Sequence, residues 1–332
     1  FLVVFWISTF SVYSQDNIVK NIINEAENNS QLELLAHELL DVIGPRLVGT
    51  PQMKNAHDWA VEKYSSWGVN SSLHEFGEWQ GWERGITHVD MTHPRLRTLT
   101  GRQLAYSPTT TNSGLEGEVT FIPEVENKEE FNKWLETING KFVLTSMYQI
   151  TGRPDYNWEE YATAESYEKM KEERDRMTEK WYANFRKMGI NRRMLNQTLE
   201  DAGAIGLFSS NWAGGFGANR VFSAGTKQIP NIDLDLEDYT MLYRMVKNEV
   251  KPKVRVVSTS KDLGVVPTFN TIGIIPGVEK PEEYVVLSAH FDSWDGSTGA
   301  TDNGTGTIVM MEAMRILKSV YPNPKDNSCR HW

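Results

Sequence analysis

The stretch "SAHFDSWDGSTGATDNGTG", Ser288–Gly306, decides the fold class. It follows a nearly continuous apolar run, Tyr284–Ala289, which is typical of a central strand covered on both faces. It leads into "GTIVMMEAMRILKSVY", which has the pattern of a helix over 305–321. A strand, a glycine-rich turn and a helix in this order form part of a βαβ unit. The sequence therefore predicts an α/β fold that contains part of a doubly wound sheet.

The ends of the predicted strand and helix carry residues that suit a metal ion. In open α/β sheets, ligands bind beyond the carboxyl ends of the strands. His290 and Asp292 lie where the strand ends, and Asp302 lies where the helix begins. Imidazole nitrogen and carboxylate oxygen are natural ligands of Zn²⁺, and a ligating histidine usually donates its other ring N–H to a carboxylate. We predict that His290 and Asp302 converge on a metal and that Asp292 orients the His290 ring.

A histidine followed two places later by an aspartate is weak evidence for a metal site when it stands alone. The sequence contains a second such pair, with which His290 and Asp292 can be compared. His88–Asp90, "HVD", has the same spacing. It lacks the glycine-rich turn and the acid at a helix start, so we interpret it as ordinary strand or loop. The alternative for His290 is a structural histidine, which the strand end, the turn and Asp302 together disfavour.

The stretch "HFDSWDGSTGATDNGTG" closely resembles the metal loop of the co-catalytic zinc exopeptidases. Its opening and the following G-A-x-D are most similar to the plasma glutamate carboxypeptidase branch of that family. "GPRLVGTP" (44–51) resembles the family segment before an inserted domain, and "FNTIGIIPG" resembles the return to the peptidase domain. "GKFVLTS", "AGAIGLF" and "IPNIDLD" resemble landmarks of a protease-associated domain.

The resemblance implies a role for each residue of the loop. His290 would bind one zinc ion, Asp302 would bridge two, and Asp292 would orient His290. Two zinc ions in a complete site hold and deprotonate a water and polarise the scissile carbonyl. Trp294 and Asp295 would shape the rim. The implied function is a secreted zinc-dependent exopeptidase acting on peptides, with aminopeptidase action favoured over carboxypeptidase action.

The expected organisation has five parts. The apolar start, "FLVVFWISTFSVYS", matches the central region of a secretory signal, which predicts a secreted or periplasmic protein; a buried N-terminal strand is the alternative. The parts are a signal peptide (1–14), the N-terminal part of the peptidase domain (15–99), a β-rich protease-associated domain (100–261) with a helical insert at about 159–188, the first part of the zinc peptidase core (262–325) and an off-pattern tail (326–332).

Two helices are expected before residue 70. Ser30 and Glu33 form a capping-box pattern for the first, which stops at Gly44. The second starts at Thr50, followed by proline at a first-turn position, and ends near Gly68. His37 and His57 lie on these helices and are interpreted as ordinary helix positions.

The family pattern also requires residues that the sequence does not show. A Glu-Glu pair, one general base and one ligand, should follow the next strand, with a further acid and a histidine later. After Lys325 the chain reads "DNSCRHW", which has no β pattern. We therefore expect a truncated chain that is inactive alone and poorly soluble. Glu312 is no substitute for the base, because it lies mid-helix on the polar stripe.

Two other functions fit the sequence less well than a peptidase. A non-catalytic, receptor-like or peptide-binding protein of the same architecture is the main alternative; retention of His290, Asp292 and Asp302 together disfavours it. A serine hydrolase is disfavoured because the chain contains no G-x-S-x-G.

A net charge of −10 without a basic stripe makes nucleic acid a poor partner. No stretch after the start is apolar enough to span a membrane, and the single cysteine, Cys329, excludes an intramolecular disulfide.

Overall fold

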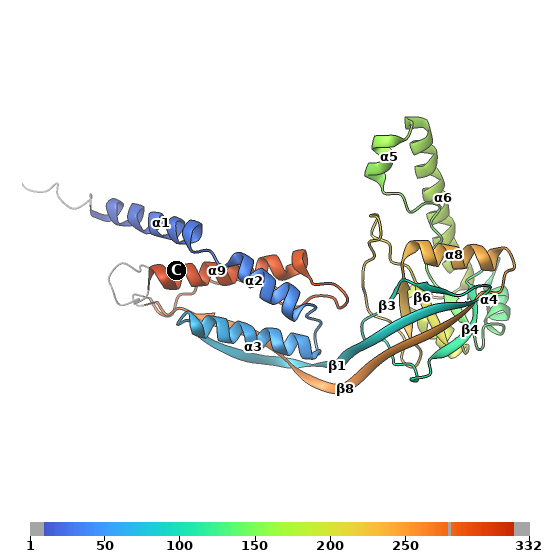
Figure 1. Cartoon of the computed structure of the whole chain (residues 1–332), viewed down its shortest axis with the longest axis horizontal. Helices are drawn as coiled ribbons and strands as arrows, with labels where there is room; N and C mark the ends of the chain where they lie inside the picture. Colours follow the sequence, from blue (N-terminus) through green and yellow to red (C-terminus); the bar gives the residue numbers. More distant parts are fainter. Residues whose placement is uncertain (1–9, 278–279, 322–332) are drawn as a thin grey trace, which may run out of the picture. The chain divides into compact units, whose positions relative to one another are not determined.

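The computed structural model describes residues 10–277 and 280–321, which form two compact units. The first unit contains residues up to 81 and from 263 onward, and the second contains 82–262. Two long strands, β1 (Asn70–His93) and β8 (Lys253–Ile274), are neighbours in the sheet order and carry the chain across both borders (Figure 1). The predicted insertion, 100–261, lies inside the second unit, whose first residue is Trp82.

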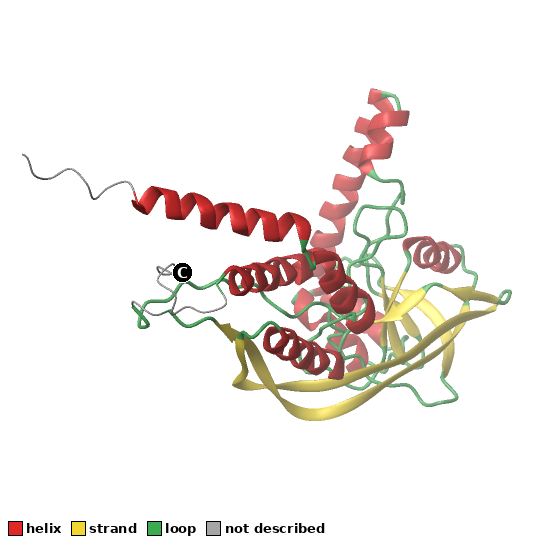
Figure 2. Cartoon of the chain, turned by 60° about the vertical axis from the view of Figure 1, so that its left-hand side comes forward, coloured by secondary structure: helices red, strands yellow, loops and turns green. Residues whose placement is uncertain are grey.

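The first unit is mainly helical in its described part (Figure 2). Its helices are α1 (Phe10–Asn28), α2 (Leu32–Ala36), the π-helix η1 (His37–Ile43), α3 (Pro51–Ser66), the short π-helical segment η3 (Ala300–Gly304) and α9 (Thr305–Val320). Helix α9 packs against α1 and α2, and η1 packs against α3. Their shared core is made of Leu35, Leu39, Ala56, Ala60, Tyr64, Val69, Ile308 and Met311. The predicted helix over 305–321 is thus present.

The start of the chain differs from the sequence-based expectation. Helix α2 has Gln31 at its N-cap with no side-chain cap, so the predicted capping box of Ser30 and Glu33 is wrong. The Ser30 hydroxyl instead accepts a hydrogen bond from the Leu32 amide at 3.3 Å. Helix α1 was not predicted; it includes residues 10–14 of the expected signal, while 1–9 lie outside the described residues. No helix within the described ranges combines the length and apolarity needed to cross a membrane.

Helix α3 begins as its sequence predicts. The Thr50 hydroxyl accepts a hydrogen bond from the Met53 amide at 3.2 Å and donates one to the Leu47 carbonyl at 2.7 Å. Pro51 occupies the first helical turn, where a missing N–H costs nothing. The face that carries Ala56, His57, Ala60 and Tyr64 is buried. These positions place one wall of the site described below.

Replacing Thr50 by alanine is expected to lower the free energy of unfolding of the first unit by about 1 kcal/mol, because the helix loses its N-cap acceptor. Urea unfolding followed through Trp59 and Trp67, which pack against the core of this unit, measures the loss. Thr50→Ser keeps the hydroxyl and is the matched control. Equal losses in the two variants would show that the methyl group, and not the cap, stabilises this end of α3.

The second unit is an α/β structure built on a mixed sheet. Its remaining strands are β2 (Arg97–Leu99), β3 (Gly101–Gln103), β4 (Leu115–Phe121), β5 (Phe142–Leu144), β6 (Gly206–Ser209) and β7 (Asn231–Leu234). The sheet order is β2-β1-β8-β4-β5-β6-β7-β3. Strands β4, β5, β6 and β7 are parallel to one another. The pairs β1–β2, β4–β8 and β3–β7 are antiparallel.

Helices cover both faces of this sheet. They are α4 (Lys128–Leu135), α5 (Asp155–Tyr161), α6 (Ala164–Met188), the 3₁₀ turn η2 (Arg192–Met194), α7 (Leu195–Asp201) and α8 (Leu236–Lys247). In β5, Phe142 and Leu144 join the core that contains α8 residues, while Val143 joins the core under α4, α6 and α7. This alternation follows from the two-residue repeat of a strand. Helices α5 and α6 lie in the region of the predicted helical insert, and Met170, Phe185 and Met188 of α6 are buried.

The predicted strand over Tyr284–Ala289 is wrong. These residues are assigned no strand, and Tyr284, Val285 and Val286 are 78%, 64% and 78% exposed. An apolar run forms a strand only when its backbone groups pair with a neighbour, and no described segment pairs with this one. The described sheet is thus the mixed sheet above, and the described residues of 262–277 and 280–321 do not form the expected part of a doubly wound sheet. The expected tail, 326–332, lies outside the described residues.

Candidate metal centre

The loop 290–304 brings together the three residues that the sequence singled out. His290 Nε2 lies 2.7 Å from Asp302 Oδ1. On the other side of the ring, His290 Nδ1 lies 3.1 Å from the Asp292 carbonyl oxygen and 3.3 Å from Asp292 Oδ1. The Thr307 hydroxyl, on α9, donates to the His290 carbonyl at 3.3 Å. The turn and the helix start therefore bring these side chains together, although the strand predicted before His290 is not formed.

Both ring nitrogens of His290 face oxygen acceptors, which favours a proton on each. Burial alone lowers the pKa of His290, but the hydrogen bond to Asp302 and the negative charge of Asp292 outweigh it and raise the pKa. A proton on Nε2 would lie between this nitrogen and the Asp302 carboxylate oxygen, in the place that a metal cation would take. All three side chains are about half exposed or more, so solvent and ions reach them.

The donor set fits zinc in kind. Imidazole nitrogen and carboxylate oxygen converge from one side, and a second carboxylate faces the other ring nitrogen, as is usual for a metal-ligating histidine. No group of three or more His, Cys, Asp or Glu side chains suited to a metal lies within 10–277 and 280–321. The described residues thus supply two direct donors, His290 and Asp302, where a catalytic zinc site usually takes about three from protein.

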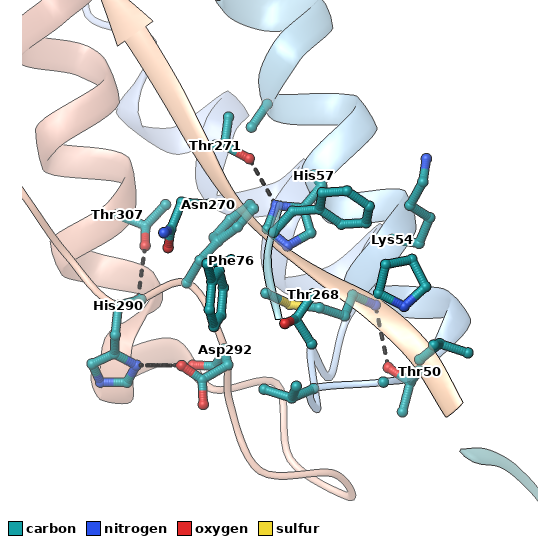
Figure 3. A pocket seen from close by; sticks show the side chains of 18 of the residues that line it. Thr50, Lys54, His57, Phe76, Thr268, Asn270, Thr271, His290, Asp292 and Thr307 are labelled. Carbon is teal, nitrogen blue, oxygen red and sulfur yellow. Dashed lines mark hydrogen bonds and ion pairs between the residues drawn. The ribbon is translucent and has the colours of Figure 1, made fainter. Parts of the chain in front are cut away.

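A cavity of about 480 Å³ lies beside His290 and Asp292. Helix α3, strand β8 and residues 289–292 contribute much of its wall, and Figure 3 shows His290 and Asp292 at one side of it. Its lining is largely apolar and includes Phe76, Phe269 and Met311. Trp294 and Asp295, expected at the rim, do not line this cavity; Asp295 is buried.

His57 is a cavity residue whose environment the sequence interpretation missed. It is 2% exposed, and its Nδ1 lies 2.7 Å from the Thr271 hydroxyl (Figure 3). Its ring meets Phe291 edge-on, with centroids 5.2 Å apart. Burial lowers the pKa of His57 to about 4. The available signal was its spacing from Ala60 and Tyr64, which places all three on the buried face of α3.

The glycine-rich loop of the candidate metal centre lies within the part of the chain that matches a known family. Residues 270–329 match the model of peptidase family M28. The matched segment includes the loop that carries His290, Asp292 and Asp302. The chain is 24% identical to human carboxypeptidase Q over 319 residues, which are 95% of this chain and 61% of that protein. The chain therefore spans about three fifths of the length of this relative.

Two solved structures are similar to the chain in fold. An M28 peptidase precursor from Shewanella amazonensis matches with a TM-score of 0.58 and 20% identity, over 92% of this chain and 63% of that one. A zinc aminopeptidase from Bacillus subtilis matches with a TM-score of 0.51 and 19% identity, over 87% of this chain and 57% of that one. The mixed α/β fold of this chain thus matches those of the two solved structures.

Proposed function

We propose that the protein is a secreted or periplasmic zinc exopeptidase and that this chain supplies two ligands of its metal centre. His290 would bind one zinc ion, and Asp302 would bridge two. The observation that carries the proposal is the 2.7 Å approach of His290 Nε2 to Asp302 Oδ1, with Asp292 on the far side of the ring. We also propose that the β-rich second unit is a protease-associated domain.

The residues around His290 have separate roles in this proposal. Bound zinc would supply Lewis acidity for the scissile carbonyl and would lower the pKa of an attacking water. With zinc bound, Asp292 would accept a hydrogen bond from Nδ1 of His290, which would fix the tautomer that leaves Nε2 free to bind the cation. Thr307 holds the His290 backbone in place through its carbonyl. The apolar cavity beside Asp292 would accept part of the substrate.

The charges near His290 support aminopeptidase action. Asp292 and Asp302 carry exposed carboxylates, which attract an α-ammonium group and repel an α-carboxylate. Lys54 is the single lysine or arginine among the described residues that line the cavity, and it is paired with Asp58 at 2.5 Å. A substrate carboxylate would have to compete with Asp58 for this cation.

The test is hydrolysis by the native protein with zinc of two matched substrate sets. Aminoacyl-nitroanilides offer a free amino terminus, and N-acetyl dipeptides offer only a free carboxyl terminus. We expect turnover of the first set that a chelator abolishes and added zinc restores. Turnover of the acetylated set alone would replace the aminopeptidase proposal by a carboxypeptidase, and no turnover of either set by the zinc-loaded protein would refute the exopeptidase.

A further inference from the structure

Arg46, in the stretch "GPRLVGT", is a fully buried cation close to the candidate metal centre. Its guanidinium donates four hydrogen bonds, and every acceptor is a backbone carbonyl. The acceptors are Gly44 (2.9 Å), Phe291 (2.9 Å), Thr298 (2.9 Å) and Gly299 (3.1 Å). The Arg46 backbone also contacts the loop, because its amide donates to the Ser293 hydroxyl at 2.9 Å and its carbonyl accepts from the Ser293 amide at 3.0 Å.

Three of these carbonyls, those of Phe291, Thr298 and Gly299, lie in the loop that carries the proposed ligands. Phe291 directly follows His290, and Gly299 directly precedes η3, which contains Asp302. Arginine presents its donors in a rigid planar fork, so the carbonyl groups that it binds are fixed relative to one another. One side chain therefore ties the backbone after His290 to the backbone before Asp302.

The loop is also packed around the guanidinium. Gly299 has a φ of +63°, and a Cβ there would lie 2.3 Å from Ser293 Cβ and 3.0 Å from Arg46 Nη2. The Gly304 amide closes the turn with a hydrogen bond of 2.8 Å to the Gly299 carbonyl. A glycine is thus required where the loop passes Arg46, and the two ends of the loop close against the same group.

A buried charge is costly unless polar partners replace its water. Burial lowers the pKa of Arg46, and the negative charge of Asp292 acts in the opposite direction. An apolar side chain of similar length would fill the same space without this cost but would leave the four carbonyls without their donors. The buried charge of Arg46 is therefore explained by the backbone carbonyls that it binds, three of which belong to the loop.

We propose that Arg46 is a positioning residue of the metal centre, which holds His290 and Asp302 in the geometry that lets Nε2 and Oδ1 share one cation. The proposal rests on the metal role of His290 and Asp302 proposed above. It predicts that loss of the guanidinium weakens metal binding far more than an equally disruptive change elsewhere in the same unit.

The test compares Arg46→Met with Arg315→Met in the native protein. Arg315 is also buried and lies in the first unit, on α9, where it pairs with Glu312 and Glu25. Zn²⁺ alone is the probe, titrated while the ring signals of His290 are followed by NMR of ¹⁵N-histidine-labelled protein. Thermal unfolding of each variant is measured in parallel.

We expect Arg46→Met to weaken Zn²⁺ binding at His290 by about 10–100-fold, as is typical when an outer partner of a metal site is lost. Hydrogen exchange should accelerate for the amides of 291–304. Arg315→Met should lower the Tm and leave the Zn²⁺ affinity within about twofold. Arg46→Lys, which keeps the charge but not the planar fork, should recover part of the affinity and provides a folded comparison if Arg46→Met does not fold.

Two outcomes separate this inference from the proposed function. If the His290 signals of the unmodified protein do not respond to Zn²⁺, the metal role itself fails. If they respond, but Arg46→Met and Arg315→Met weaken binding by equal factors in proportion to their Tm losses, Arg46 acts only through general stability and the positioning role is refuted. Unchanged affinity in Arg46→Met would refute it as well.

Discussion

Replacing His290 by alanine is expected to lower kcat/KM for aminoacyl-nitroanilides by more than about 100-fold in the native protein. Loss of an outer partner of a metal site already costs about 10–100-fold, and loss of a ligand removes more. Asp302→Ala should behave in the same way, because its Oδ1 shares the 2.7 Å contact with His290 Nε2. Asp292→Asn should cost less, about 10–100-fold, because Asp292 only orients the ring.

The chain contains a matched control for this series. His88 and Asp90, in β1, have the same spacing as His290 and Asp292 but lie on a regular strand. His88→Ala is expected to leave kcat/KM within about twofold of the unmodified protein, in line with an ordinary change outside a site. Steady-state kinetics with excess zinc and metal analysis of each purified variant give both readouts. Full activity in His290→Ala would remove this histidine from the metal centre.

The candidate centre was predictable because its information is local. His290, Asp292 and Asp302 lie within thirteen residues, and a glycine-rich turn and a helix start are encoded in that interval. The same holds for α3, whose N-cap is Thr50 because its hydroxyl accepts from the amide three residues later. Features set by one turn or one cap can be derived from the sequence without knowledge of distant segments.

The missed features depend on partners far apart in the chain. Arg46 binds carbonyls about 250 residues away, and a buried arginine has no local pattern that distinguishes it from an exposed one. Glu312 was predicted to lie on the polar stripe of the last helix, yet it is buried beside Arg315. Helix α1, which was not predicted, brings Glu25 to Arg315. Here the pairing of two elements, and not either sequence alone, decides burial.

The error at Tyr284–Ala289 has a different origin. An apolar run of this length has high strand propensity, but strand formation requires a paired neighbour for its backbone groups. The described residues leave the side chains of Tyr284, Val285 and Val286 exposed. The apolar run therefore has the propensity of a strand, but the described residues contain no neighbouring strand that pairs with it.

Acidification is expected to destabilise the first unit through His57. Its folded-state pKa is about 4, chiefly because burial disfavours the charged ring, and the ordinary value is 6.5. Unfolding therefore takes up a proton between these values, so the free energy of unfolding falls as pH falls from 6.5 towards 4 and is fully retained above 6.5. A pKa lowered from 6.5 to about 4 corresponds to a loss of about 3 kcal/mol in the free energy of unfolding on acidification.

Other charges face His57 and must be separated from it. On its own helix, Asp58 raises the pKa of His57 and Lys54 lowers it, both less than burial does. Thr271 on β8 and the ring of Phe291 complete its surroundings without adding charge. His290, in the same unit, has a raised pKa, so its contribution to stability is present at low pH and is lost as pH rises. A direct pH profile of stability therefore mixes opposing effects.

The difference between the unmodified chain and His57→Gln isolates the effect of this residue. Glutamine cannot titrate and keeps a polar group near Thr271. Urea unfolding from pH 7.5 to pH 4.5, followed by ¹⁹F NMR of fluorotryptophan at Trp59 and Trp67, reports on the first unit. The stability difference should shift in favour of the glutamine variant as pH falls below 6.5. A difference that stays constant across this range would show that the His57 ring already accepts a proton in the folded chain, and that its site is open to water.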